Sequence, residues 1–374
     1  MKRKKNSVFI LVFLFIIFSI TIGYAYLSSN LTMLGNVIVK KYEPPRYLYN
    51  EVISQNKENG LMVLDNQAST YVSASTGIDF GVAPSDTNGK GVYVRNGTEN
   101  DSYPIYYYRG DVTNNNVAFA GFCWKMVRTT ETGGIKLIYN GVLNNDICNN
   151  TDEESEIGKS IFNDNGNSNA YVGYMYGTPN SNTYEAEHLS TKDSTSSIIK
   201  NYIDEWYRTN MINYTEYLED TIWCNDRSVN SGTGVGVDDT FYNPFKRTIS
   251  TPSLECVNQN DRFTVNEIIE GRLAGNGALT YPVALLTVDE VTLAGILDFG
   301  YGNNGYLTTN SDFWLLSPRN LYEGSAAGFS VHDGGFYPNG VSSNAGVRPS
   351  ISLASGTKIS NIGDGSVNNP FVVE

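Results

Sequence analysis

Residues 281–290, YPVALLTVDE, open the stretch that decides the fold. Pro282–Leu286 is an apolar run of strand length, and it passes directly into Thr287, with Glu290 placed as in a helix capping box. We expect the Thr287 hydroxyl to accept from the Glu290 N–H, while the Glu290 carboxylate accepts from the Thr287 N–H. Gly295 then offers a helix stop. The stretch therefore predicts a strand that turns at once into a short helix.

The residues that follow are typical of short strands separated by turns. The strand candidates are 314–318 (WLLSP), 329–331 (FSV) and 346–353 (GVRPSISL), with a turn expected at 333–335 (DGG). Trp314 is assigned a structural role. Arg348 falls inside the last strand, where a guanidinium remains only if carboxylate or carbonyl groups accept from it, so its predicted role is also structural.

This block resembles the C-terminal part of uncharacterised Gram-positive cell-surface proteins, whose domain looks like a divergent relative of the C-type-lectin-like fold shared with formylglycine-generating enzymes. The resemblance is carried by 285–290 (LLTVDE), 314–318 and 346–349 (GVRP), and it extends to 119–124 (FAGFCW), 137–141 (LIYNG) and 223–228 (WCNDRS). It implies an α+β fold of short antiparallel strands and a few helices, with the lectin-like block at about 281–355. The enzymes use cysteines near the end of their domain, whereas the last cysteine here is Cys256, so their activity does not carry over.

The amino terminus is typical of an exported protein. Lys2–Lys5 is basic, and the apolar run that starts at Val8 continues far enough to cross a bilayer. Gly23–Ala25 has the small-x-small pattern of a signal-peptidase site. Residues 1–27 are therefore either a cleaved signal peptide or a retained hydrophobic helix that anchors the protein in the membrane. Both alternatives place the rest of the chain on the extracellular side of the cell envelope.

The remaining chain divides into a stalk and one domain. The prolines of Lys40–Pro45 (KKYEPP) favour an extended stalk over residues 28–60. No clean linker divides residues 61–374, which are predicted as a single elaborated α+β domain with a β-rich N-terminal region. The chain has a net charge of −13, which opposes long-range attraction to nucleic acid, so we expect no nucleic-acid partner.

A hairpin and a helix are the clearest elements before the C-terminal block. Residues 119–128 and 135–139 are the best strand pair and are joined through 131–134 (ETGG). Ser194–Arg208 is the clearest helix, because a serine or threonine at its start can cap it and its apolar residues share one face.

The cysteines suggest two disulfides, because an even number in an exported chain is typical of an oxidising compartment. Cysteines occupy four positions, and the order along the chain favours Cys123 with Cys148 and Cys224 with Cys256. Each bond is expected to add about 3 kcal/mol of stability by restricting the unfolded chain.

Metal and catalytic sites lack a clear signature. Residues 143–192 are rich in oxygen ligands that suit calcium, yet their spacing does not reproduce an EF-hand loop. Zinc is disfavoured because the cysteines lack C-x-x-C spacing and neither His188 nor His332 stands beside one. Neither histidine accompanies a nucleophile motif, and no phosphate-binding glycine loop occurs. We expect no enzyme and no cofactor, with calcium as the open alternative.

C-type-lectin-like domains carry ligand sites on the loops between their last strands, so the resemblance implies a site on residues 319–328 and 332–344. The residues expected to contact an extracellular glycan or protein are Tyr322, Phe336, Tyr337, Asn339 and Asn344. The predicted function is adhesin-like ligand binding at the cell surface. A structural component of a surface layer or fibre is the alternative, and an enzyme similar to the formylglycine-generating enzymes is the second alternative.

Overall fold

The structure, a computed structural model, describes residues 16–20, 44–55, 57–58, 61–62, 78, 80–84, 90–95, 103–248, 251–300 and 305–374. The chain divides into two units, residues 1–44 and residues 45–374. In the first unit residues 16–20 are helical, and the rest of the predicted apolar helix at 1–27 lies outside the described residues. Across the described ranges, none of the helices has the length and apolar character needed to cross a membrane.

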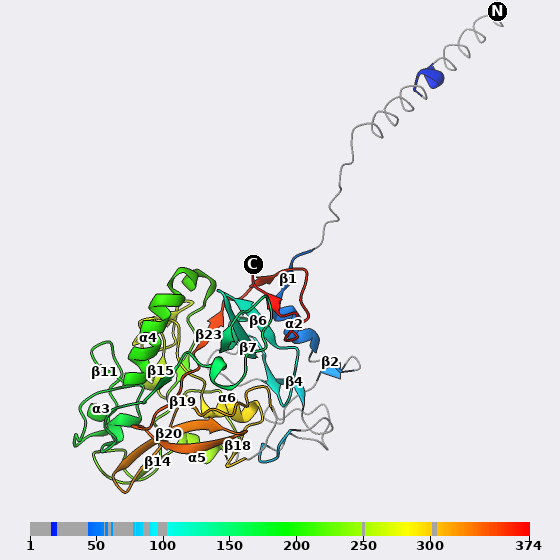
Figure 1. The fold of residues 1–374 in the computed structure, drawn as a ribbon. Coiled ribbons are helices and arrows are strands. Elements are labelled where there is room, and N and C mark those ends of the chain that lie inside the picture. Colours follow the sequence, from blue (N-terminus) through cyan, green and yellow to red (C-terminus); the bar gives the residue numbers. More distant parts are fainter. Residues whose placement is uncertain are drawn as a thin grey trace, which may run out of the picture. The chain divides into compact units, whose positions relative to one another are not determined.

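The second unit is built on two large sheets (Figure 1). Sheet I contains β4 (Gly91–Arg95), β5 (Ile105–Arg109), β6 (Asn116–Phe119), β7 (Phe122–Thr129), β8 (Ile135–Val142), β23 (Ser350–Leu353) and β25 (Phe371–Val372). Its order is β23-β8-β7-β5-β4, with β6 beside β7 and β25 beside β6. β7 and β8 are the predicted hairpin. β23 brings the C-terminal block into this sheet by pairing with β8.

Sheet II contains β9 (Lys159–Ser160), β13 (Val229–Ser231), β14 (Thr240–Tyr242), β18 (Leu297–Asp298), β19 (Phe313–Tyr322), β20 (Ser325–His332), β21 (Gly335–Gly340) and β22 (Ala345–Gly346). Its order is β13-β14-β19-β20-β21-β18, and β22 joins β19 to β9. The predicted strands at 314–318 and 329–331 are confirmed within β19 and β20. The predicted turn is confirmed at Asp333 and Gly334, whose φ angles are 44° and 81°.

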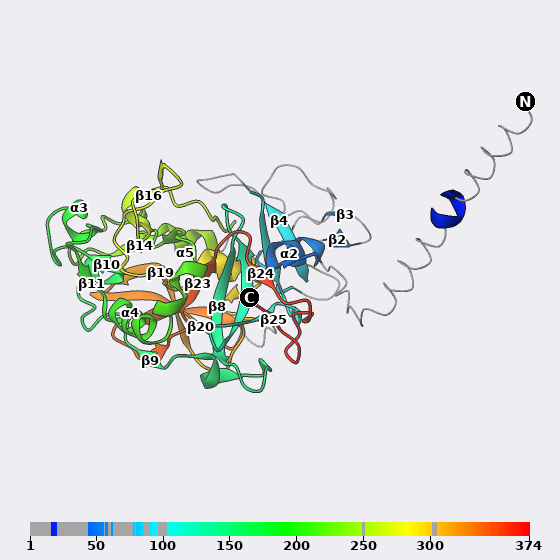
Figure 2. The same cartoon turned by 90° about the horizontal axis from the view of Figure 1, so that it is seen from above.

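Short strand pairs and helices complete the unit. The pairs are β1 (Arg46–Tyr47) with β24 (Lys358–Ile359), β2 (Lys57–Glu58) with β3 (Leu61–Met62), β10 (Met175–Tyr176) with β11 (Thr195–Ser196), β12 (Trp223–Cys224) with β15 (Arg262–Phe263), and β16 (Ile268–Ile269) with β17 (Arg272–Leu273). The helices are α2 (Leu48–Gln55), α3 (Tyr184–Glu187), α4 (Ile198–Asn210), α5 (Asn243–Thr248) and α6 (Val288–Leu293), with 3-10 turns η2 (Asp152–Ser155), η3 (Asn169–Val172), η4 (Ile212–Tyr217) and η5 (Gln259–Asp261). The predicted α+β class is therefore confirmed. Figures 1 and 2 show α2 and α3 at opposite ends of the unit.

The capped helix at Thr287 is confirmed as α6, but the strand predicted before it is wrong. Pro282–Leu286 is buried, and only Ala284 forms a bridge, with Ser350 of β23 in sheet I. Two residues later, the Leu286 carbonyl accepts from the Leu316 N–H of sheet II at 2.8 Å. The segment therefore passes from one sheet to the other, and its backbone cannot continue a ladder with either of them.

The predicted stalk over 28–60 is wrong from residue 45 onwards, and residues 28–43 lie outside the described residues. Leu48–Gln55 forms α2, whose Leu48 and Val52 are fully buried in the core. Pro44 and Pro45 precede this helix, where proline does not interrupt helical hydrogen bonds. The compact unit consequently begins at Pro45.

The predicted helix at Ser194–Arg208 is present but begins later. Thr195–Ser196 forms β11, and Ser197 caps α4 by accepting from the Lys200 N–H at 3.2 Å. The apolar face is confirmed, since α4 buries Ile199, Ile203 and Tyr207.

Candidate functional site

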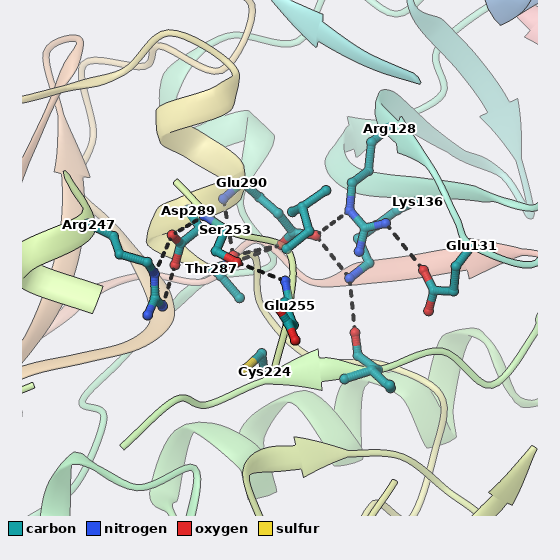
Figure 3. A pocket seen from close by; sticks show the side chains of 12 residues that line it. Arg128, Glu131, Lys136, Cys224, Arg247, Ser253, Glu255, Thr287, Asp289 and Glu290 are labelled. Carbon is teal, nitrogen blue, oxygen red and sulfur yellow. Dashed lines mark hydrogen bonds and ion pairs between the residues drawn. The ribbon is translucent and has the colours of Figure 1, made fainter. Parts of the chain in front are cut away.

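Glu290 at the start of α6 is the centre of a buried charged network (Figure 3). The capping box is complete, because Thr287 Oγ1 accepts from the Glu290 N–H at 3.1 Å and Glu290 Oε2 accepts from the Thr287 N–H at 3.0 Å. Glu290 Oε1 also accepts from Arg128 Nε at 2.8 Å and lies 3.0 Å from Lys136 Nζ. These cations come from β7 and β8, so one carboxylate caps α6 and fastens it to sheet I.

The charges in this network shift one another's pKa values. Burial opposes the ionisation of Glu290, but the charges of Lys136 and Arg128 outweigh it and lower its pKa to about 2. Burial lowers the pKa of Lys136, and the negative charge of Glu290 opposes that shift. Glu290 is therefore ionised at neutral pH, and its negative charge favours the protonated form of Lys136.

A second group of ion pairs lies beside the first, around Arg247. Arg247 donates from Nε and Nη2 to the two oxygens of Asp289, at 2.8 Å each, and from Nη1 to Asp226 at 2.7 Å. Asp289 also accepts from the Ser253 N–H at 2.8 Å. The bidentate geometry fixes α5 against the first turn of α6.

The cavity among these groups is too small for a ligand. It measures about 20 Å³, enough for about one water molecule. Arg128 also lies 3.7 Å from the carboxylate of Glu131. Arg128, Lys136 and Arg247 each have a carboxylate partner within the protein, so we assign this network to the stability of the fold.

The predicted ligand contact at Phe336 is wrong. Its side chain is 0 % exposed and packs on Phe329, with ring centroids 5.7 Å apart. Tyr337 faces the other side of β21, is partly buried, and donates from its hydroxyl to the Gly300 carbonyl at 3.1 Å. The error arises because residues 335–340 form a strand, in which neighbouring side chains point to opposite faces of a sheet.

Three of the predicted ligand residues do reach solvent, but they line neither the cavity beside Glu290 nor any larger cavity found among the described residues. Tyr322 is 49 % exposed at the end of β19. Asn339 is partly exposed on β21, and Asn344 is exposed just before β22. The predicted loops at 319–328 and 332–344 are largely occupied by β19, β20 and β21, so the structure does not gather these residues into one loop site.

The residues with predicted structural roles are buried and hydrogen-bonded. Trp314 donates from Nε1 to the Ser160 carbonyl at 2.8 Å. Arg348 donates to the Tyr139 carbonyl at 3.1 Å, to the Leu307 carbonyl at 3.2 Å and to Asn140 Oδ1 at 3.0 Å. Arg348 lies between β22 and β23 and not, as predicted, inside a strand, and the following Pro349 has no N–H to donate to a ladder.

Both predicted disulfides are present. Cys123 of β7 is bonded to Cys148, and Cys224 of β12 is bonded to Cys256, across sequence separations of 25 and 32 residues. Disulfides of this kind are typical of proteins that fold in an oxidising compartment.

The histidines and acidic side chains do not form a metal centre in the part of the chain that the structure describes. His188 is buried with Nε2 3.0 Å from the Gly234 carbonyl, and burial lowers its pKa to about 3. His332 is partly exposed and lies 2.6 Å from Asp312.

A much larger cavity, which we call the α4 cleft, has a volume of about 420 Å³. Its apolar lining comes from Met175, Val265, Ala278 and Leu279. The polar residues that line it are Lys192, Ser194, Ser196, Lys200, Asn266 and Thr280. The cleft therefore lies between the segment that leads into α4 and the segment 265–280.

Both walls of the α4 cleft are held by hydrogen bonds. On one side, Lys200 Nζ is 2.6 Å from Asp204 Oδ2 and 3.4 Å from Thr280 Oγ1, which ties α4 to the opposite segment. On the other side, Asp220 accepts from the N–H groups of Val265 and Asn266 at 2.9 and 2.8 Å. The cleft is consequently pre-formed, which reduces the entropy lost when a ligand binds.

The α4 cleft is not predictable from the sequence pattern. The serine-rich start of α4 was visible as a capping signal, but residues 265–280 carry no pattern that connects them with it. Comparison of the chain with protein-family models, with curated proteins and with solved structures finds no match in any of the three.

Proposed function

We propose that the protein is an exported cell-surface protein that binds an extracellular ligand, a glycan or a protein segment, in the α4 cleft. The volume of about 420 Å³ carries this proposal, because ligand sites are typically clefts of ~300–1,000 Å³ with apolar walls and a few fixed polar groups. Export is supported by the basic and apolar amino terminus and by the two disulfides.

We also propose that residues 281–355 adopt a divergent C-type-lectin-like fold, and that the chain belongs with the Gram-positive surface proteins that it resembles. The antiparallel series β19, β20 and β21, which follows a short helix and is followed by the return of β23 to sheet I, supports this assignment. In this proposal the ligand site is not on the loops that C-type lectins use.

Filling the cleft tests the function. Ser196→Trp places an indole into it, whereas Thr195→Trp adds the same group to the exposed opposite face of β11. The extracellular chain is labelled and applied to arrays of glycans and peptides. We expect Ser196→Trp to lose the wild-type signals and Thr195→Trp to keep them. Equal binding by the two folded variants, or no wild-type signal, would reject the proposal.

A specific observation also supports the alternative of a surface layer or fibre. Ile268 and Leu273 are cross-strand neighbours in the β16–β17 pair and are 62 % and 65 % exposed. This strand pair belongs to no larger sheet. Exposed apolar side chains on such a pair are typical of association surfaces. If the chain polymerises, the apparent molar mass from light scattering will rise with protein concentration, and Ile268→Ser with Leu273→Ser will abolish the rise.

A further inference from the structure

We infer that the ligand of the α4 cleft carries an anionic group, a carboxylate, phosphate or sulfate, and that Lys192 binds this group. The inference rests on the proposed binding function of the cleft and adds the chemical class of the ligand. It follows from the charges that line the cleft and from the positions of its polar groups.

The charged side chains that line the cleft within the described residues are both positive, Lys192 and Lys200. This composition contrasts with the whole chain, which has 39 acidic and 26 basic residues. The acidic surface repels anions at long range, and the carboxylate of Asp204 already pairs with Lys200, so Lys192 is the lining charge that remains for a ligand. Complementary local charge is what selects an anion against this background.

The two lysines have different roles. Lys200 is buried, and its ammonium is held by Asp204 at 2.6 Å and by Thr280 at 3.4 Å, so its charge maintains the wall. Lys192 is exposed, and it takes part in no ion pair with another described residue. Its long side chain therefore has both the charge and the freedom to meet an anion in the cleft.

Hydroxyl groups supply the remaining donors. Thr280 Oγ1 accepts from Lys200, which leaves the hydroxyl hydrogen of Thr280 able to donate to a ligand oxygen. Ser196 adds a second hydroxyl to the lining, beside Met175 on the neighbouring strand. An anion that accepts from one ammonium and two hydroxyls gains charge-assisted hydrogen bonds, which are stronger than neutral ones.

The test uses matched pairs of acidic and neutral probes. Oligosaccharides that contain hexuronic acids are compared with their methyl esters, and acidic peptides with their amidated forms, while inorganic phosphate serves as a competitor. The protein is the full extracellular chain, and the variants are Lys192→Gln and the control Lys358→Gln. Lys358 is an exposed lysine of β24, so the control removes the same charge at another place.

In at least one pair, we expect the acidic probe to bind the protein and its neutral counterpart not to bind. Lys192→Gln should weaken binding about tenfold, as for a partly exposed charge-assisted contact, and should reduce its salt dependence, whereas Lys358→Gln should not. Binding that survives esterification or amidation, or that Lys192→Gln leaves unchanged, overturns the inference, and so does a lack of binding by every acidic probe at millimolar concentration. If neutral probes bind and Ser196→Trp abolishes this binding, the cleft function stands and only the anionic ligand is rejected.

Discussion

Replacing Glu290 with glutamine is expected to destabilise the protein by about 3–5 kcal/mol, the usual cost of breaking a buried ion pair from one side. Glutamine keeps the shape of the side chain, and its carbonyl oxygen can still accept one of the hydrogen bonds. Its amide group, however, presents hydrogens where Arg128, Lys136 or the Thr287 N–H now donate. Lys136 and Arg128 would remain buried without their shared carboxylate.

The pKa of Glu290, which depends on the same contacts, leads to a similar magnitude. A pKa of about 2 in the folded protein lies below the ordinary value of 4.5. Such a shift stabilises the fold by about 3 kcal/mol above pH 4.5, and this stability is lost as the pH falls towards 2. Both routes therefore give a large fraction of the ~5–15 kcal/mol by which domains are usually stable.

Urea denaturation of the disulfide-bonded protein at pH 7, followed by tryptophan fluorescence, measures the loss. Glu154 provides a matched control, because it completes a capping box with Thr151 at 3.2 Å but is exposed and holds no buried cation. Glu154→Gln should cost less than about 0.5 kcal/mol. If Glu290→Gln costs no more than Glu154→Gln, the assignment of Glu290 as the link between α6 and sheet I is refuted.

Three further changes test other parts of the structure. Thr287→Ala should cost about 1 kcal/mol through loss of the α6 cap, and an unchanged unfolding midpoint would contradict the capping geometry. Arg348→Met should cost a few kcal/mol because three hydrogen-bond acceptors lose their donor, so a fully stable variant that loses ligand binding would place Arg348 in the site instead. Burial raises the pKa of Glu156 to about 7. The folded state therefore holds a proton that the unfolded state releases above pH 4.5, and stability falls as the pH rises from about 4.5 to 7. Glu156→Gln should stabilise the protein by about 1–3 kcal/mol at pH 8 and not at pH 4, and equal effects at both pH values would contradict the shift.

Features that depend on neighbours along the chain were predictable from the sequence. The Thr287 and Glu290 cap and the Asp333–Gly334 turn join residues only a few positions apart, and the hairpin formed by β7 and β8 joins consecutive strands, starting with the pair Thr129 and Ile135. Their hydrogen bonds close small loops, so residue type and spacing suffice to indicate them. The disulfide partners also follow chain order, although their separations are larger.

The partners of these local features were decided only by the tertiary structure. Glu290 meets Arg128 and Lys136 from sheet I, more than a hundred residues earlier in the chain, and nothing in the capping box indicates them. The burial of Phe336 depended on which face of β21 turns towards the core, and this face is set by the pairing with β20.

The residues of the proposed binding site were also brought together only by the tertiary structure. Lys192 and Ser196 lie before α4, and Asn266 and Thr280 lie about 70 to 90 residues later, yet together they line one cavity. The sequence predicted a serine- or threonine-capped helix that starts near Ser194, because a cap is a local hydrogen bond, but the structure places the cap of α4 at Ser197. Which segment packs opposite it depends on long-range contacts among surfaces of similar composition, and only the folded chain selects one such arrangement.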